Sequence, residues 1–273
     1  EIDQTTIRSR NGTHSLINNV GFVSGVSGGA VTAAYFALKK RDALTDFREK
    51  FLIRNAEEGI STSIGPVNLV RAMGGGVNDV RTFSNWLNAN LFNGATFADF
   101  RKTPGPRVWI NASDIYNRTP FIYGEAVFIA LCSDLASYPI ADAVAASAAV
   151  PIVFSPMVIK TFPKQCTDKP PEWVEKAHDN PHAAPLLKAF ADALYSYQDG
   201  STKYIKLLDG GLVDNFGLSG FNISRLSARF RARPRSLCWA ARSRTGRRRC
   251  GAAPPAITTA HWAPARCRRP SGK

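Results

Sequence analysis

One turn in the sequence sets the strictest limits on the fold. A short apolar run at residues 20–24 leads into the glycine-rich turn Gly25-Val26-Ser27-Gly28-Gly29, and a helical pattern follows directly over residues 28–40. The apolar run predicts a buried strand, and the glycines allow strand and helix to approach each other closely. The sequence therefore predicts a strand, a tight elbow and a helix in immediate succession.

Helical and strand-like patterns alternate along the chain after this unit. The predicted helices cover residues 42–59, 79–92, 140–150, 171–178 and 185–198, and the predicted strands cover residues 107–116, 119–124 and 203–209. A third short apolar stretch follows the first two of these strands, at residues 126–131. This alternation predicts a layered α/β fold, although the helix-rich insertions hide the order of the strands.

The net charge of +14 is concentrated at the C-terminal end of the chain. Residues 225–273 contain thirteen Arg and one Lys but no acidic residue, whereas residues 1–224 balance 21 basic against 21 acidic residues. The tail has no apolar periodicity and is not expected to build a core. Three interpretations are open: a flexible or disordered tail, a basic arm, or a segment produced when GC-rich codons are translated out of frame. Because the body is neutral, we expect no nucleic-acid partner.

The elbow has the features that a nucleophilic serine needs. Gly25 and Gly29 lie two positions either side of Ser27, which gives the pattern G-x-S-x-G between a strand and a helix. The backbone N–H of Gly28 and the dipole of the following helix would stabilise a developing oxyanion. The pattern alone is weak evidence for catalysis, and the strand before it and the helix after it strengthen that evidence.

A serine nucleophile also needs a base within hydrogen-bonding distance. Asp209 ends an apolar strand, and Gly210 and Gly211 after it allow the backbone to pass close to another segment. Asp209 is therefore one candidate base. The alternative is a Ser-His-Asp esterase, for which the chain offers Asp142, Asp168, His178 and His182. Both histidines lie in the polar stretch KAHDNPHAAP, which is typical of a solvated surface.

Four blocks together make the pattern specific. They are GVSGG at 25–29, NASD at 111–114, AASAAVPIVFSP at 145–156 and LLDGGLVDNFGL at 207–218. In this order they resemble the patatin-like phospholipases, over roughly residues 15–226. The resemblance implies a three-layer α/β/α fold with a central, mostly parallel sheet. It also implies a Ser27–Asp209 dyad that hydrolyses phospholipids or other lipid esters through an acyl-enzyme, with no metal or organic cofactor and with peripheral membrane contact.

One departure from the family pattern concerns the oxyanion hole. Family members carry a Gly-rich loop upstream of the serine, and residues 1–17 do not supply it. We therefore expect residues 1–224 to form a catalytic domain without the first core strand and that loop, and residues 225–273 to form a separate tail. Gly28 is then the one oxyanion donor that the sequence names. A catalytically impaired, lipid-binding patatin-like module is the alternative.

Two of the five cysteines, Cys132 and Cys166, lie in the body of the chain. Neither belongs to a CxxC pair, and their spacing is compatible with a disulfide or with two buried thiols. The blocks around them resemble a bacterial subgroup that is often exported as lipoproteins. From that resemblance we expect a disulfide and an exported or membrane-anchored protein, with the signal absent from this sequence. A cytoplasmic protein is the alternative.

Overall fold

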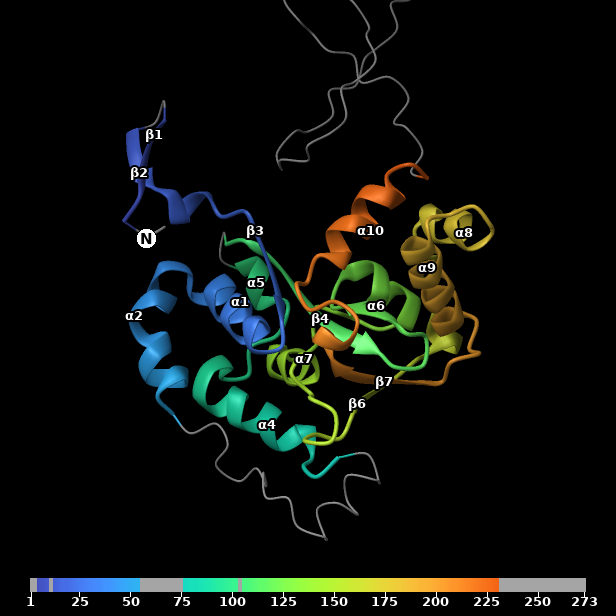
Figure 1. Ribbon diagram of the computed structural model, residues 1–273, viewed down its shortest axis with the longest axis horizontal. Coiled ribbons are helices and arrows are strands. Elements are labelled where there is room, and N and C mark those ends of the chain that lie inside the picture. The colour runs from blue at the N-terminus through green and yellow to red at the C-terminus, as the bar shows by residue number, and fades with distance from the viewer. Residues whose placement is uncertain (1–3, 10–11, 55–75, 103–104, 231–273) are drawn as a thin grey trace, which may run out of the picture. The chain divides into compact units, whose positions relative to one another are not determined.

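A five-stranded sheet lies at the centre of the fold (Figure 1). The computed structural model describes residues 4–9, 12–54, 76–102 and 105–230, and the compact unit ends at Phe230. The strand order is β3-β4-β7-β6, and β5 also pairs with β4. The bounds are Phe22–Val26 for β3, Arg107–Asp114 for β4, Thr119–Ile122 for β5, Met157–Lys160 for β6 and Tyr204–Asp209 for β7. Residues 231–273 of the predicted tail lie outside the described residues.

The sheet is mixed in strand direction. β3 runs parallel to β4, whereas β5 and β7 are antiparallel to β4 and β6 is antiparallel to β7. A parallel pair needs a long crossover, and helices supply it between β3 and β4, while a short turn suffices between β4 and β5. Among the described strands, the parallel pairing that the family resemblance implied is found between β3 and β4.

The register of the sheet brings the ends of two strands together. Val26, the last residue of β3, lies opposite Asn111, and Asp209, the last residue of β7, lies opposite Ala112. Since Asn111 and Ala112 are neighbours in β4, β3 and β7 end at the same level from opposite directions. The turns that follow the two strands therefore meet at this level.

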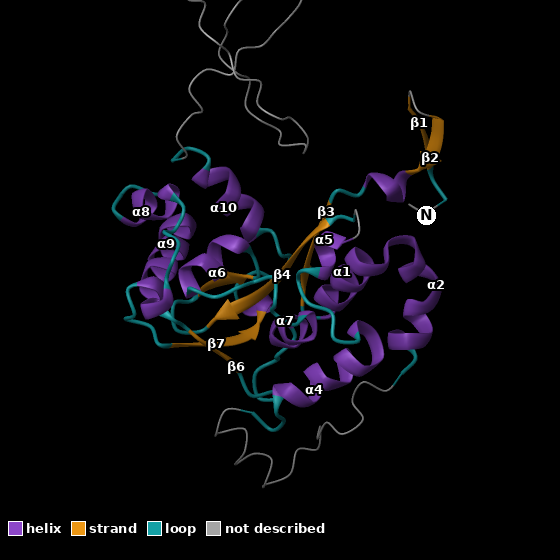
Figure 2. Ribbon diagram, turned by 180° about the vertical axis from the view of Figure 1, so that it is seen from behind, coloured by secondary structure: helices purple, strands orange, loops and turns teal. Residues whose placement is uncertain are grey.

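Helices cover both faces of the sheet, as Figures 1 and 2 show. In one layer α1 packs on β3, α7 packs on β4 and β7, and α4 packs on α7; in the other, α9 contacts β5, α6, α8 and α10. The bounds are Gly28–Lys39 (α1), Ala43–Phe47 (α2), Val80–Leu87 (α4), Asp99–Lys102 (α5), Glu125–Leu131 (α6), Ile140–Ser147 (α7), Glu172–His178 (α8), Pro185–Gln198 (α9) and Ser219–Ser227 (α10). The predicted three-layer α/β/α fold is confirmed.

Most predicted elements form near their predicted bounds, and the differences are local. The apolar stretch at 126–131 forms α6, and residues 55–59 of the predicted helix 42–59 lie outside the described residues. β6 and the hairpin of β1 (Thr6–Ser9) and β2 (Gly12–Ser15) were not predicted. Each of these strands has four residues, which is too short for a clear alternation of apolar and polar side chains. No helix in the described ranges is long and apolar enough to cross a membrane.

Small side chains allow α7 to lie close to the sheet. Its buried residues include Ala141, Ala143, Ala145 and Ala146, and Ser147 at its end is fully buried. A helix that presents alanines to a sheet can approach the strands more closely than one that presents larger side chains. The segment that follows α7 consequently reaches β7, where the backbone N–H of Asp209 donates to the carbonyl of Ala149 at 2.9 Å.

A disulfide joins Cys132, directly after α6, to Cys166, in the segment that follows β6. The structure thus pairs the two cysteines that the sequence left either bonded or free. The bond closes a loop with a sequence separation of 34 residues. Such a cross-link stabilises a fold mainly by reducing the conformational freedom of the unfolded chain.

Removal of this disulfide is expected to lower the free energy of unfolding without altering the elbow. For a loop of this length the chain-entropy relation gives about 4 kcal/mol as an upper value. The measurement is denaturant unfolding of the oxidised protein, the reduced protein and the Cys132→Ala/Cys166→Ala variant. The reduced protein and the double variant should unfold at the same lower midpoint, and a reductant should not change the variant. Equal midpoints for all three would contradict the prediction.

Candidate active site

Ser27 lies in a strained turn between β3 and α1. Its backbone angles are φ 53° and ψ −128°, a conformation that non-glycine residues rarely adopt and that costs about 1–3 kcal/mol. The turn is closed by the N–H of Ala30, which donates to the carbonyl of Ser27 at 2.9 Å. A Cβ atom on Gly25 would lie 2.5 Å from the carbonyl oxygen of Gly29, so only glycine fits there. The predicted strand, elbow and helix are present.

Asp209 lies within hydrogen-bonding distance of this serine. The hydroxyl of Ser27 donates to Oδ2 of Asp209 at 2.7 Å, across a separation of 182 residues. The other carboxylate oxygen, Oδ1, accepts the backbone N–H of Gly211 at 2.8 Å. Asp209 is 8% exposed. Each of its two carboxylate oxygens accepts one defined donor, which fixes the orientation of the carboxylate.

The glycines after Asp209 allow β7 to turn against β4. A Cβ atom on Gly210 would lie 2.2 Å from the backbone oxygen of Asn111, closer than any real Cβ contact. On the nucleophile side, a Cβ at Gly28 or Gly29 would meet no described atom within 4 Å. Gly28 begins α1, and its N–H is one of the first amides of a helix, which have no acceptor inside the helix. An anionic oxygen could therefore approach this amide beside Ser27.

Three polar residues near the elbow escaped the sequence analysis. The N–H of Ser27 donates to Oγ of Ser147 at 3.0 Å, and the Ser147 hydroxyl donates to the carbonyl of Asn111 at 2.6 Å. The Asn111 side chain donates to Oγ of Ser24 and to the carbonyl of Gly25, both at 2.9 Å. Asn111 and Ser147 belong to two of the sequence blocks, NASD and AASAAVPIVFSP, but nothing in those blocks showed which side chains face the elbow.

The two candidate histidines form other contacts. Nδ1 of His178 lies 2.7 Å from Oδ1 of Asp192, and its ring stacks on Tyr195 with a centroid distance of 4.2 Å. His182 lies on an exposed turn, where its N–H donates to the side chain of Asn180. The acceptor of the Ser27 hydroxyl is Asp209, and neither histidine takes this position.

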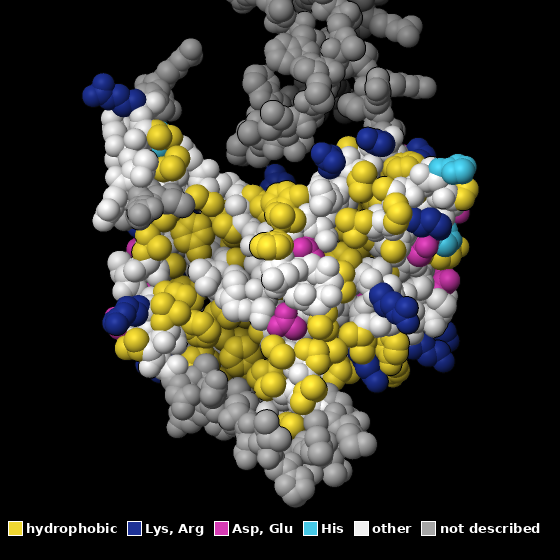
Figure 3. Space-filling view, in the orientation of Figure 1, with side chains coloured by type: hydrophobic (Ala, Val, Ile, Leu, Met, Phe, Trp, Pro, Cys, Tyr) yellow, Lys and Arg dark blue, Asp and Glu magenta, His cyan; other side chains and the backbone are white. Residues whose placement is uncertain are grey.

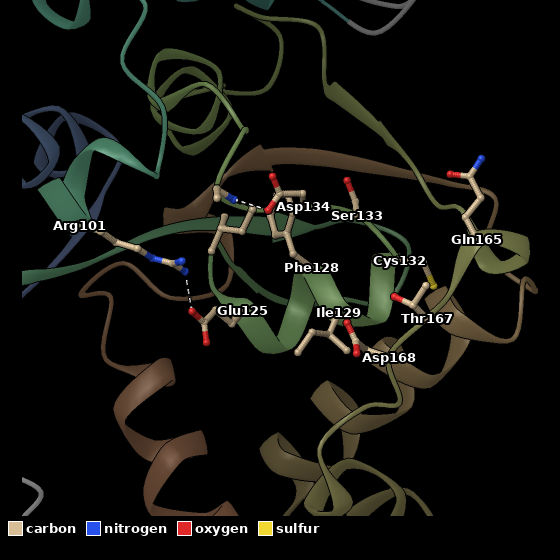
Figure 4. Close-up of a pocket in the computed structure, with 12 residues that line it drawn as sticks. Arg101, Glu125, Phe128, Ile129, Cys132, Ser133, Asp134, Gln165, Thr167 and Asp168 are labelled. Atoms are coloured by element: carbon tan, nitrogen blue, oxygen red, sulfur yellow. Dashed lines mark hydrogen bonds and ion pairs between the residues drawn. The ribbon is translucent and has the colours of Figure 1, made fainter. Parts of the chain in front are cut away.

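The two other candidate carboxylates of a histidine triad also lie elsewhere. Asp142, in α7, accepts the hydroxyl of Ser84 from α4. Asp168 lines a pocket beside Cys132, together with Arg101 and Glu125, which form an ion pair at 2.7 Å (Figure 4). No group of three His, Cys, Asp or Glu residues in the described part of the chain is arranged to hold a metal ion.

Comparison with protein families identifies the family of the chain. A family model described as patatin-like phospholipase matches residues 9–221, which cover the elbow, α7 and the end of β7. The chain belongs to the patatin-like phospholipase family. A search of the curated proteins found no match for this patatin-like chain. Membership in the family indicates a lipid acyl hydrolase, which acts on lipid esters.

Proposed function

We propose that this patatin-like protein is a phospholipase A or lysophospholipase in which Ser27 is the nucleophile and Asp209 the base. The observation that carries the proposal is the 2.7 Å hydrogen bond from the Ser27 hydroxyl to Oδ2 of Asp209. A serine hydroxyl attacks an ester only when a nearby base accepts its proton, and a carboxylate can be that base. Gly28 contributes an oxyanion donor at the start of α1.

The proposed reaction has two halves. In the first, Oγ of Ser27 attacks the ester carbonyl carbon while Oδ2 of Asp209 takes the hydroxyl proton, and the N–H of Gly28 donates to the oxygen that becomes negative. The tetrahedral intermediate then expels the alcohol, which takes the proton from Asp209, and the acyl group remains on Ser27. In the second half, Asp209 takes a proton from a water molecule whose oxygen attacks the acyl carbonyl carbon. The bond from this carbon to Oγ of Ser27 then breaks, Oγ takes the proton back from Asp209, and the fatty acid leaves.

Exposed apolar side chains on two loops support a lipid substrate. In the segment that follows Asp209, Leu212 is 55% exposed and Phe216 is 81% exposed, and in the segment that follows Ala149, Ile152 is 68% exposed. These loops begin at the two residues that the Asp209 N–H joins. Hydrophobic side chains occupy much of the face in Figure 3. Such a surface suits an acyl chain and peripheral contact with a lipid surface.

Covalent labelling with a fluorophosphonate tests the nucleophile directly. The serine oxygen should displace fluoride from phosphorus, and the phosphonyl group should then remain on Ser27. Residues 11–39 lie between Arg10 and Lys39 and form one tryptic peptide that also contains Ser15 and Ser24, so fragmentation within this peptide identifies the modified serine. We expect the label on Ser27 in the wild type and none in Ser27→Ala.

Release of fatty acid from phospholipid and lysophospholipid vesicles then tests the substrate class. An active protein should release fatty acid from at least one of the two, and the ratio distinguishes the two types of phospholipase. Vesicle binding without labelling or release would instead support the catalytically impaired lipid-binding module. Labelling of a serine other than Ser27 would contradict the assignment of the nucleophile.

A further inference from the structure

We propose that Ser147 is a positioning residue that holds the nucleophile elbow in its reactive conformation. The proposal rests on the function proposed above and adds a residue that does not touch the substrate. Ser147 is the last residue of α7 and is fully buried. Its hydroxyl is the one side-chain group that the described structure shows bound to the backbone N–H of Ser27.

The direction of both hydrogen bonds of Ser147 is fixed. A hydroxyl has one proton, and a backbone carbonyl can only accept, so the Ser147 proton is committed to the carbonyl of Asn111 at 2.6 Å. The lone pairs of the same oxygen are then available to the N–H of Ser27, which lies 3.0 Å away. The hydroxyl oxygen of Ser147 therefore acts as the acceptor of the Ser27 N–H while its own proton is donated to Asn111.

The elbow needs such an acceptor because its conformation is strained. At φ 53° and ψ −128°, Ser27 lies outside the regions that an L-residue normally occupies, and such a residue persists only where its surroundings hold it. The carbonyl of Ser27 is held by the N–H of Ala30, and the N–H is held by Ser147. The two contacts act on opposite sides of the residue and together set the direction of its Cα–Cβ bond.

The same short segment also holds the proposed base. Two residues beyond Ser147, the carbonyl of Ala149 accepts the N–H of Asp209 at 2.9 Å. The carbonyl oxygen of Asn111, which accepts the Ser147 proton, is also the atom nearest to where a Cβ on Gly210 would lie. Residues 147–149 thus contact the backbones of both Ser27 and Asp209, and Ser147 fixes the nucleophile relative to its base.

Ser147→Ala is expected to lower kcat about 10- to 100-fold while KM changes by less than about twofold, because a small misplacement of a reacting group slows the chemical step more than it weakens binding. The substitution keeps the volume of the side chain nearly unchanged and removes its hydroxyl. Ser227→Ala is the matched control. Ser227 is 1% exposed, ends α10 and donates within its own helix at 3.0 Å. This variant should keep the wild-type kcat.

Hydrogen exchange of the Ser27 amide provides a readout that does not depend on catalysis. In the wild type this amide should exchange slowly, and in Ser147→Ala its exchange should accelerate at least tenfold while amides of β4 and β7 keep their protection. An unchanged kcat together with an unchanged Ser27 amide would overturn the proposal. Faster exchange throughout the sheet, with kcat reduced only in proportion to the folded fraction, would also overturn it, since Ser147 would then be an ordinary structural residue.

Failure of the proposed function would look different. In that case the wild type would neither release fatty acid nor react with the fluorophosphonate, whatever residue stands at position 147. The exchange rate of the Ser27 amide in wild type and in Ser147→Ala would still decide whether Ser147 holds the elbow.

Discussion

Ser27→Ala is expected to abolish ester hydrolysis, with a loss of at least about a thousandfold in kcat. Removal of the hydroxyl removes the atom that bonds to the acyl group. In serine hydrolases the catalytic residues act as a unit, so loss of the nucleophile alone removes nearly all of the rate enhancement that these residues provide together. The fold should remain intact, because the backbone contacts of Ser27 with Ser147 and Ala30 do not involve its hydroxyl.

The measurement is the steady-state release of p-nitrophenol from a short p-nitrophenyl ester, with thermal unfolding of the same samples. Ser133→Ala is the matched control, since Ser133 is exposed and lines the pocket beside Cys132, away from the elbow. It should retain wild-type turnover. A Ser27→Ala protein that stays folded and hydrolyses the ester at the wild-type rate would rule out Ser27 as the nucleophile.

Asp209→Asn is expected to cause a loss of similar size, on the order of a thousandfold or more. An amide is nearly isosteric with the carboxylate and keeps an oxygen that can accept the N–H of Gly211, but it cannot take the proton of the Ser27 hydroxyl. The folded state should thus change little while proton transfer is lost. Hydrolysis of the same short ester measures the effect.

His178→Ala separates the dyad from the histidine triad. His178 binds Asp192 between α8 and α9, so its loss should leave turnover close to the wild-type value and affect only the packing of these helices. If His178→Ala were inactive while Asp209→Asn stayed active, the roles proposed here would be wrong and a triad esterase would be favoured. The two variants should be compared at the same fraction of folded protein.

The part of the site that the sequence predicted could be recognised from local sequence patterns. The glycines around Ser27 and after Asp209 mark places where backbone must turn sharply or pass close to a neighbour, and the structure shows these close approaches at Gly25 and Gly210. The helices α8 and α9 likewise begin and end within one residue of their predicted bounds, because their apolar residues recur at helical spacing.

The parts that the sequence did not predict depend on register between distant segments. Ser147 reads as one small residue in an alanine-rich helix, and its role becomes visible only once α7 lies against β4. The antiparallel pairing of β7 with β4 is likewise decided by packing rather than by any local pattern. β6 consists of only four residues, and prolines precede it. Prolines disfavour a strand, and four residues are too few to indicate one, so local preferences did not predict β6.

The separation of 182 residues between Ser27 and Asp209 has a consequence for the order in which the protein matures. During synthesis the elbow emerges well before β7, and contacts between distant segments form late because a long loop must close first. A nascent chain that stops before Tyr204 carries the serine without its carboxylate. With Ser27 and Asp209 in the proposed roles, the growing chain thus gains its base only after β7 has been made and has paired with β4.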